Sequence, residues 1–209
     1  DRLRAAWTSF NDNAAQAYAE PIQMDPLPGS PDLSQMRLDA NPFVPGDSVE
    51  LSSRCHEVLE IQAAALAKCV DHTGAKRLLI GISGGLDSTL ALIACIRTCD
   101  LLGLPRKFVC AVTMPGFGTS KRTRGNAEKL AELTGVELRK IPISAAVEQH
   151  FADIGHDPKN HNVVYENAQA RERTQILMDL ANAEGGFVVG TGDLSELALG
   201  WATYNGDHM

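Results

Sequence analysis

The chain has 209 residues, a formal net charge of −7 at pH 7 and an apolar fraction of 44%. This length is enough for one domain with a substantial core and short for two, and no apolar run approaches the roughly 20 residues that cross a bilayer. The acidic balance offers no general attraction for nucleic acid or anionic lipid, so we expect a globular domain that binds neither nucleic acid nor a membrane.

Residues 1–47 are rich in Pro, Gly, Asp and Ser and show no sustained periodicity, apart from a short helix expected over residues 3–18. Such a composition is typical of a linker or an arm. Because the chain starts without methionine and stops at Met209 without a terminal element, we expect a fragment of a longer protein. Residues 48–209 are then the folded domain, which we expect to be incomplete at its C-terminal end.

From residue 48 onward apolar residues repeat at helical spacing as far as Gly74, which predicts a helix with Asp47 or Ser48 as its N-cap. Strands and helices then alternate. The expected strands are residues 77–83, 107–114, 136–143 and 186–190. The expected helices are residues 87–102, 121–134 and 195–201, and a helical region is expected after residue 143 that includes a long helix at about 164–183. This alternation predicts an α/β fold, a doubly wound parallel sheet of Rossmann-like type with helices on both faces. Ligands bind such sheets at the carboxyl ends of the strands, where the strand order reverses.

Five cysteines occur, and none forms a C-x-x-C pair. Cys95 and Cys99 are four residues apart and would share a helix face, where two thiols could bind a metal ion. Because free cysteine usually packs as a small apolar side chain, we expect buried, reduced thiols instead. Such thiols favour a cytoplasmic location.

The tract HFADIGHDPKNHN contains a second group of possible metal ligands, His150, Asp153, His156, Asp157 and His161. Its spacing has no regular period, and Gly, Pro, Asn and Asp are residues of turns and loops. We therefore expect a mobile polar loop rather than a metal site.

The loop SGGLDS follows the first strand of the alternating pattern and begins its helix. Free N–H groups and the helix dipole make such a junction an anion site. Gly84 and Gly85 let the backbone approach a phosphate, and Ser83 and Ser88 add hydroxyl donors. A carboxylate such as that of Asp87 would repel a phosphate, unless both bind a shared Mg²⁺ ion.

The pattern S-G-G-x-D-S resembles the pyrophosphate loop of the N-type ATP pyrophosphatases, a family with the adenine nucleotide alpha hydrolase-like fold. The family includes GMP, asparagine, argininosuccinate and NAD synthetases and enzymes that thiolate tRNA or form lysidine. Its members cleave ATP between the α- and β-phosphates. The resemblance implies ATP as co-substrate and Mg²⁺ as cofactor, with catalytic roles for Asp87 and Ser88. An N-capped helix after a glycine turn is the alternative that needs no ligand.

Three later stretches resemble glutamine-dependent NAD synthetase. They are GTGDLSELALGWATY at residues 190–204, YENAQARERT at 165–174 and AVTMPGFGTSKR at 111–122. Thr113 departs from the arginine that the small ammonia-dependent NAD synthetases carry at this strand end, which favours the glutamine-using branch. Taken alone, the first two stretches are typical of a capped helix and of a polar helix face with Glu–Arg pairs.

This resemblance implies a role for individual residues. The residues implied to bind ATP are Ser83, Gly84, Gly85, Leu86, Asp87, Ser88, Thr89, Met114 and Thr191. The residues implied to bind deamido-NAD are Asn167, Arg171, Arg173, Glu196, Trp201, Ala202, Thr203 and Tyr204. Asp87 and Glu196 are implied to hold the metal ion. Arginine suits phosphate because its guanidinium group donates two hydrogen bonds in one plane.

The resemblance also implies a reaction, the ATP-dependent amidation of deamido-NAD to NAD through an adenylylated nicotinate, with release of pyrophosphate and AMP. The enzyme would be a carbon–nitrogen ligase and at least a dimer. Its ammonia would come from glutamine, through an amidase domain upstream on the same full-length chain.

Two alternatives stay open. One is a tRNA-modifying pyrophosphatase, which would show basic grooves and often C-x-x-C cysteines. The other is a non-catalytic ATP-binding protein of the universal-stress type, which would lack the S-G-G-x-D-S loop.

Overall fold

The computed structural model describes residues 41, 43–118 and 121–200. The chain divides into two units, Asp1–Val44 and Pro45–Met209, and nearly all described residues belong to the second. The helix expected over residues 3–18 lies outside the described residues. Among the helices that are described, none is long and apolar enough to cross a membrane.

Parallel strands form the described sheet, in the order β3-β2-β1-β4. The strands are β1 (Leu78–Gly81), β2 (Val109–Thr113), β3 (Glu137–Lys140) and β4 (Phe187–Val188). Leu78 of β1 pairs with Val109 of β2 on one side and with Phe187 of β4 on the other. The strand order therefore reverses between β1 and β4. The prediction of a doubly wound parallel sheet is confirmed, although each strand is shorter than expected.

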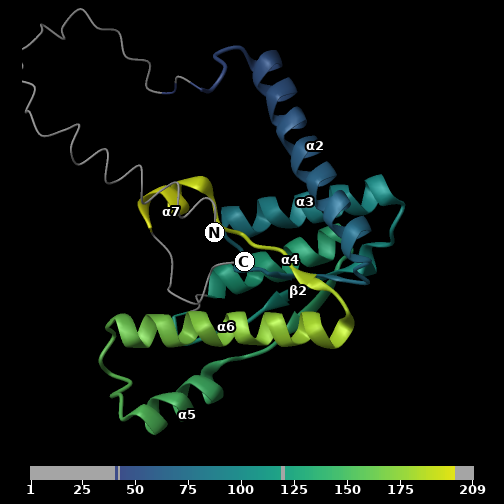
Figure 1. The fold of residues 1–209 in the computed structure, drawn as a ribbon. Coiled ribbons are helices and arrows are strands. Elements are labelled where there is room, and N and C mark those ends of the chain that lie inside the picture. The colour runs from purple at the N-terminus through teal and green to yellow at the C-terminus, as the bar shows by residue number, and fades with distance from the viewer. Residues whose placement is uncertain (1–40, 42, 119–120, 201–209) are drawn as a thin grey trace, which may run out of the picture. The chain divides into compact units, whose positions relative to one another are not determined.

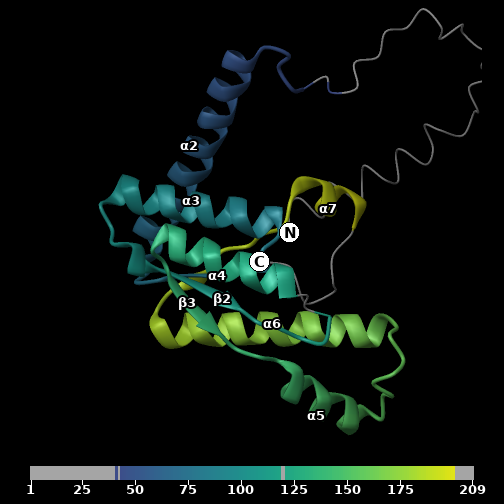
Figure 2. The ribbon, with the colours of Figure 1, turned by 180° about the vertical axis from the view of Figure 1, so that it is seen from behind.

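Helices cover both faces of the sheet, as Figures 1 and 2 show from opposite sides. One face carries α3 (Leu86–Leu102) and α4 (Lys121–Thr134), and α2 (Ser48–Thr73) packs on α3. The other face carries α5 (Ser144–Ile154) and α6 (Val163–Glu184). A short 3-10 helix, η2 (Arg106–Phe108), precedes β2, and α7 (Leu194–Leu199) follows β4.

The core has two layers because side chains alternate across each strand. Leu78 and Ile80 of β1 point into the layer shared with α3 and α4, whereas Leu79 points into the layer shared with α5 and α6. In β2, Ala111 and Val112 divide between the two layers in the same way. All five side chains are buried, as expected for strands of a parallel sheet covered on both faces.

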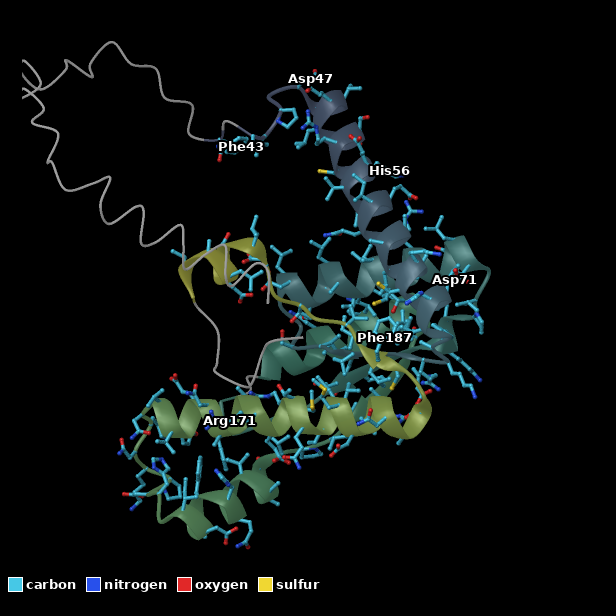
Figure 3. All side chains as sticks on the ribbon, viewed as in Figure 1. Phe43, Asp47, His56, Asp71, Arg171 and Phe187 are labelled. Atoms are coloured by element: carbon cyan, nitrogen blue, oxygen red, sulfur yellow. The ribbon has the colours of Figure 1, made fainter. Side chains whose placement is uncertain are left out.

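The ends of α2 agree with the prediction. Asp47 is the N-cap, and its carboxylate accepts hydrogen bonds from the backbone N–H groups of Val49 and Glu50, each at 2.9 Å. Figure 3 labels Asp47 at the start of this helix. Gly74 ends the helix with φ 64°, a left-handed conformation that glycine adopts without strain.

The cysteines in the core are free thiols. Cys95 and Cys99 belong to α3 and face the core layer between this helix and the sheet, and Cys110 lies on β2 in the opposite layer. Burial raises the pKa of Cys95 to about 12, so its thiol stays protonated and is a poor metal ligand. The expectation of buried, reduced thiols is confirmed for Cys95 and Cys99.

The prediction of a polar loop over the histidine tract is wrong for its first part. His150 and Asp153 belong to α5, which continues to Ile154 because Phe151 packs in the core. His161 stacks on Tyr165 with ring centroids 4.2 Å apart. No group of three or more possible metal-ligating side chains occurs among the described residues.

An ion network joins Arg77, which directly precedes β1, to β3 and to the end of α6. Arg77 lies 2.7 Å from Glu137, and Arg139 lies 2.8 Å from the same carboxylate. Arg139 also pairs with Glu184 of α6. The hydrogen bond from Arg77, with a second from Arg139, holds the pKa of Glu137 below its ordinary value.

Candidate active site

A cavity of about 380 Å³ opens at the carboxyl ends of the strands, next to the reversal between β1 and β4. Its walls come from the loop after β1, the end of β2, the middle of α6 and the segment that follows β4. Seven residues predicted from the sequence line it, namely Ser83, Asp87, Ser88, Met114, Arg173, Thr191 and Glu196. Stretches more than a hundred residues apart in the chain therefore meet where ligands bind in sheets of this type.

The loop after β1 is closed by its own hydroxyl groups. The Oγ atoms of Ser83 and Ser88 lie 3.2 Å apart, and the backbone N–H of Gly85 donates to Ser83 Oγ at 3.1 Å. Ser88 is buried, whereas Ser83 and Asp87 are exposed. Gly84 has φ 80°, a conformation that strains other residues, which explains the first glycine. The loop thus presents hydroxyl groups and a carboxylate together at the mouth of the cavity.

The N-terminus of α3 is open to an anion. Its N-cap is Gly85, which has no side chain, and no side-chain hydrogen bond caps this helix. The first N–H groups of a helix need a partner, and the helix dipole favours a negative one. Leu86 is 81% exposed and does not line the cavity, and the Thr89 hydroxyl donates to the Gly85 carbonyl at 2.7 Å. The lining therefore includes the serines and Asp87 of the loop but not Gly84, Gly85, Leu86 or Thr89.

Glu196 has a local role as well as a place in the cavity. Its Oε2 accepts the backbone N–H of Asp193 at 2.9 Å, and Asp193 accepts the N–H of Glu196 at 2.8 Å, a capping box at the start of α7. The capped-helix alternative is thus present in the structure. Glu196 still lines the same cavity as Asp87.

A Mg²⁺ ion fits this set of residues. Mg²⁺ is usually held by one or two carboxylates together with substrate phosphates and water. Asp87 and Glu196 supply two carboxylates at the cavity, beside the open N-terminus of α3 where phosphate oxygens would lie.

The residues of α6 divide between two regions. Arg173 lines the cavity, and its Nε donates to the Met114 carbonyl at 3.3 Å. Asn167 and Arg171 are half-buried nearer the start of the helix and do not line the cavity; Figure 3 labels Arg171. The predicted dinucleotide residues on α6 therefore do not all meet at one place, and Trp201, Ala202, Thr203 and Tyr204 lie outside the described residues.

Sequence reasoning missed part of the lining. Thr174 and Leu177 of α6 line the cavity and were not predicted as site residues. Thr113 and Pro115 at the end of β2 also line it, and both belong to the stretch 111–122 that was singled out from the sequence. Leu177 is four residues after Arg173, so the two lie on the same face of α6, the face turned toward the strand ends. This shared face is the sequence signal that could have identified Leu177. That face becomes recognisable only when the partner of the helix is known.

The parallel sheet, its reversal beside β1 and the loop at the start of α3 define a Rossmann-like α/β domain of the adenine nucleotide alpha hydrolase type. Residues 58–209 match the model of the NAD synthase family. The chain belongs to the NAD synthase family.

Curated relatives agree with this assignment. The chain is 40% identical over 221 residues to the glutamine-dependent NAD(+) synthetase of Mycobacterium leprae, covering 100% of this chain and 32% of the relative. It is 42% identical over 192 residues to that of Mycobacterium tuberculosis H37Rv, covering 89% and 28%. The NH(3)-dependent NAD(+) synthetase of Trichlorobacter lovleyi is 35% identical over 134 residues, covering 64% and 46%. The chain thus spans about a third or less of the two mycobacterial relatives.

Solved structures show the same fold. The glutamine-dependent NAD+ synthetase of Acinetobacter baumannii in complex with ADP has a TM-score of 0.67 and 30% identity, covering 73% of this chain and 28% of that one. The NMN synthetase of Francisella tularensis has a TM-score of 0.63 and 28% identity, covering 73% and 60%.

Proposed function

We propose that the full-length protein converts deamido-NAD to NAD by ATP-dependent amidation. The observation that carries the proposal is the convergence at one cavity of the loop residues Ser83, Asp87 and Ser88 with Thr191 and Glu196. These residues come from two motifs that lie over a hundred positions apart. Membership of the NAD synthase family and the ADP bound to the Acinetobacter baumannii relative support the same reading.

In the proposed reaction the nicotinate carboxylate attacks the α-phosphorus of ATP. The new bond joins a carboxylate oxygen to that phosphorus, and the bond to the β-phosphate oxygen breaks as pyrophosphate leaves. Ammonia then attacks the activated carbonyl carbon, AMP leaves and a proton is lost from nitrogen. Neither step needs a nucleophile from the protein, because such transfers depend mainly on positioning and charge neutralisation.

We assign the loop after β1 to the leaving pyrophosphate. The open N–H groups of α3 and the hydroxyls of Ser83 and Ser88 would hold its oxygens, after the hydrogen bond between the two hydroxyls opens. Asp87 and Glu196 would hold Mg²⁺, whose charge would favour the departure of pyrophosphate. Thr191 and Met114 would border ATP on either side of β1.

The remaining assignments concern the second substrate and the assembly. We propose that Asn167, Arg171, Arg173 and residues 201–204 bind deamido-NAD, and that residues 1–47 are an arm to an amidase domain that releases ammonia from glutamine. The name of the two mycobacterial relatives supports glutamine as the nitrogen source. We further propose a cytoplasmic enzyme that is at least a dimer.

The test uses the full-length protein with ATP, Mg²⁺ and deamido-NAD, and with either ammonium or glutamine. NAD, AMP and pyrophosphate are quantified, and equal amounts of all three are expected. Nicotinate mononucleotide is supplied in parallel, because the Francisella tularensis relative is an NMN synthetase. ATP binding without AMP release would favour the non-catalytic alternative, and AMP release only with tRNA would favour the tRNA-modifying one.

A further inference from the structure

The loop after β2 forms one wall of the cavity and is held in place by hydrogen bonds from neighbouring elements. Met114 and Pro115 line the cavity. The N–H of Ile143 donates to the Pro115 carbonyl at 3.1 Å, and Arg173, which itself lines the cavity, donates to the Met114 carbonyl. The loop is therefore anchored to α6 and to the chain that follows β3.

Gln169 of α6 supplies another anchor through its amide oxygen, while its amide nitrogen is held by the same helix. Its Oε1 accepts the backbone N–H of Phe117 at 3.2 Å, and its Nε2 donates to the Tyr165 carbonyl at 3.1 Å. The side chain is buried, so water does not compete for these groups. The ring of Phe117 also lies against Phe151 and Tyr165, with centroids 6.4 and 5.9 Å away.

Gly116 allows this contact. A Cβ atom built there would lie 2.5 Å from Oε1 of Gln169, far inside normal contact, and 3.1 Å from Arg173. The backbone of Gly116 does not have a positive φ, so conformation alone does not require glycine at this position. Gly118, in the same loop, has nothing within 4 Å of its own virtual Cβ. The difference between the two glycines lies in the side chains next to Gly116, of which Gln169 is the nearest; Arg173 and, at 3.2 Å, Ile143 are looser contacts.

We infer that Gln169 is a positioning residue that holds the loop after β2 through Phe117 and Gly116, and so fixes the cavity wall made by Met114 and Pro115. The inference rests on the proposed function in taking ATP as the ligand at that wall. Gln169 does not itself line the cavity. Its removal therefore changes ligand affinity through the loop and not through a lost contact to the ligand.

Glutamine suits this role better than its acidic counterpart. The Phe117 N–H needs an acceptor and the Tyr165 carbonyl accepts a donor, and one amide side chain provides both. A carboxylate would keep the first bond but turn a second acceptor toward the Tyr165 carbonyl. An apolar residue would leave the Phe117 N–H without this partner, which costs more than an ordinary lost hydrogen bond.

The test compares four variants of the full-length protein, Gln169→Ala, Gly116→Ala, the double variant and Gly118→Ala as the matched control. Each single change at 169 or 116 should raise KM for ATP roughly three- to tenfold, the range for one lost hydrogen bond, with kcat within about twofold. The double variant should be no worse than either single one, because without Gln169 the 2.5 Å clash is gone and only the looser contacts at 3.1 and 3.2 Å remain for the added methyl group. Gly118→Ala should match the wild type.

Hydrogen exchange supplies a readout that does not depend on the reaction. Peptides that contain Phe117 should exchange faster in Gln169→Ala and at the wild-type rate in Gly118→Ala. Additive effects in the double variant, or an unchanged KM for ATP despite faster exchange, would overturn the inference while the proposed function stands. If the wild type makes no NAD, the proposed function fails. The inference about Gln169 then requires that the dissociation constant for ATP, measured by calorimetry, change among the four variants as described for KM.

Discussion

Gly186 lies where β4 begins to run beside β1, and the substitution Gly186→Ala tests how closely the two chains approach. A Cβ atom at this position would lie 2.2 Å from the carbonyl oxygen of Arg77 and 2.9 Å from its carbonyl carbon. Ordinary contact begins at 3.4 Å, so the two backbones must separate by about 1.2 Å. Both atoms belong to the main chain, and no side-chain rotation relieves the clash.

The cost follows from the hydrogen bonds that such a shift breaks. The Phe187 N–H donates to the Arg77 carbonyl at 3.3 Å, and the Lys76 N–H donates to the Gly185 carbonyl at 2.9 Å. A net contribution of about 0.5–1.5 kcal/mol for each bond predicts a loss of about 1–3 kcal/mol in the free energy of unfolding. Figure 3 labels Phe187, the residue next to the substitution.

The matched control is Gly125→Ala in the interior of α4. A Cβ atom there meets nothing within 4 Å, so alanine should stabilise the helix by about 0.5–1 kcal/mol. The same chemical change is thus expected to have opposite signs at two glycines. Urea unfolding followed by circular dichroism measures both variants, and a Gly186→Ala protein as stable as the wild type would refute the argument from close approach.

Three further outcomes are expected. Asp87→Asn should lower kcat about 100-fold or more if charge neutralisation at pyrophosphate is central, with little change in the melting temperature because Asp87 is exposed; near-normal turnover would contradict the metal assignment. Since the pKa of Glu137 is lowered in the folded state, its stabilisation is complete above the ordinary value of 4.5 and is lost as the pH falls through the lowered one. Glu137→Gln should therefore make the melting temperature fall less steeply at acid pH than in the wild type. Parallel profiles of melting temperature against pH would show that the ion pairs of Glu137 contribute nothing to stability. Thr98→Val removes a buried hydroxyl 3.2 Å from the Ala63 carbonyl and 2.9 Å from that of Ala94, and should cost about 1 kcal/mol in urea unfolding; an unchanged midpoint would argue against a role in joining α2 to α3.

The sequence by itself determined which segments form strands and helices and in what order. Local signals were sufficient because caps and periodicity act over a few residues, as the cap at Asp47 and the end of α2 at Gly74 show. The anion-type loop at the start of α3 was predictable for the same reason, since two glycines, two serines and an acid stand together in the chain. Thr191 and Glu196 were predicted through their resemblance to a family, not through local physics.

Tertiary structure decided the bounds of the strands and of α5. The strand predicted over residues 186–190 shortens to Phe187–Val188, because pairing with a neighbour and not residue preference sets the limits of a strand. Helix α5 continues through His150 to Ile154, since burial of Phe151 stabilises a segment whose composition is typical of a loop. These errors share one cause, a contact with a residue far away in the chain.

Tertiary structure also decided what surrounds the site. Thr174 and Leu177 line the cavity only because α6 crosses the ends of β1 and β2, and Gln169 meets Gly116 only because that helix lies behind the loop. A sequence shows that a side chain is polar or small but not which backbone atom lies next to it. The residues that give the loop after β1 its chemistry are neighbours in the chain and could be predicted from it. The residues that complete the cavity around this loop depend on how the helices pack against the sheet.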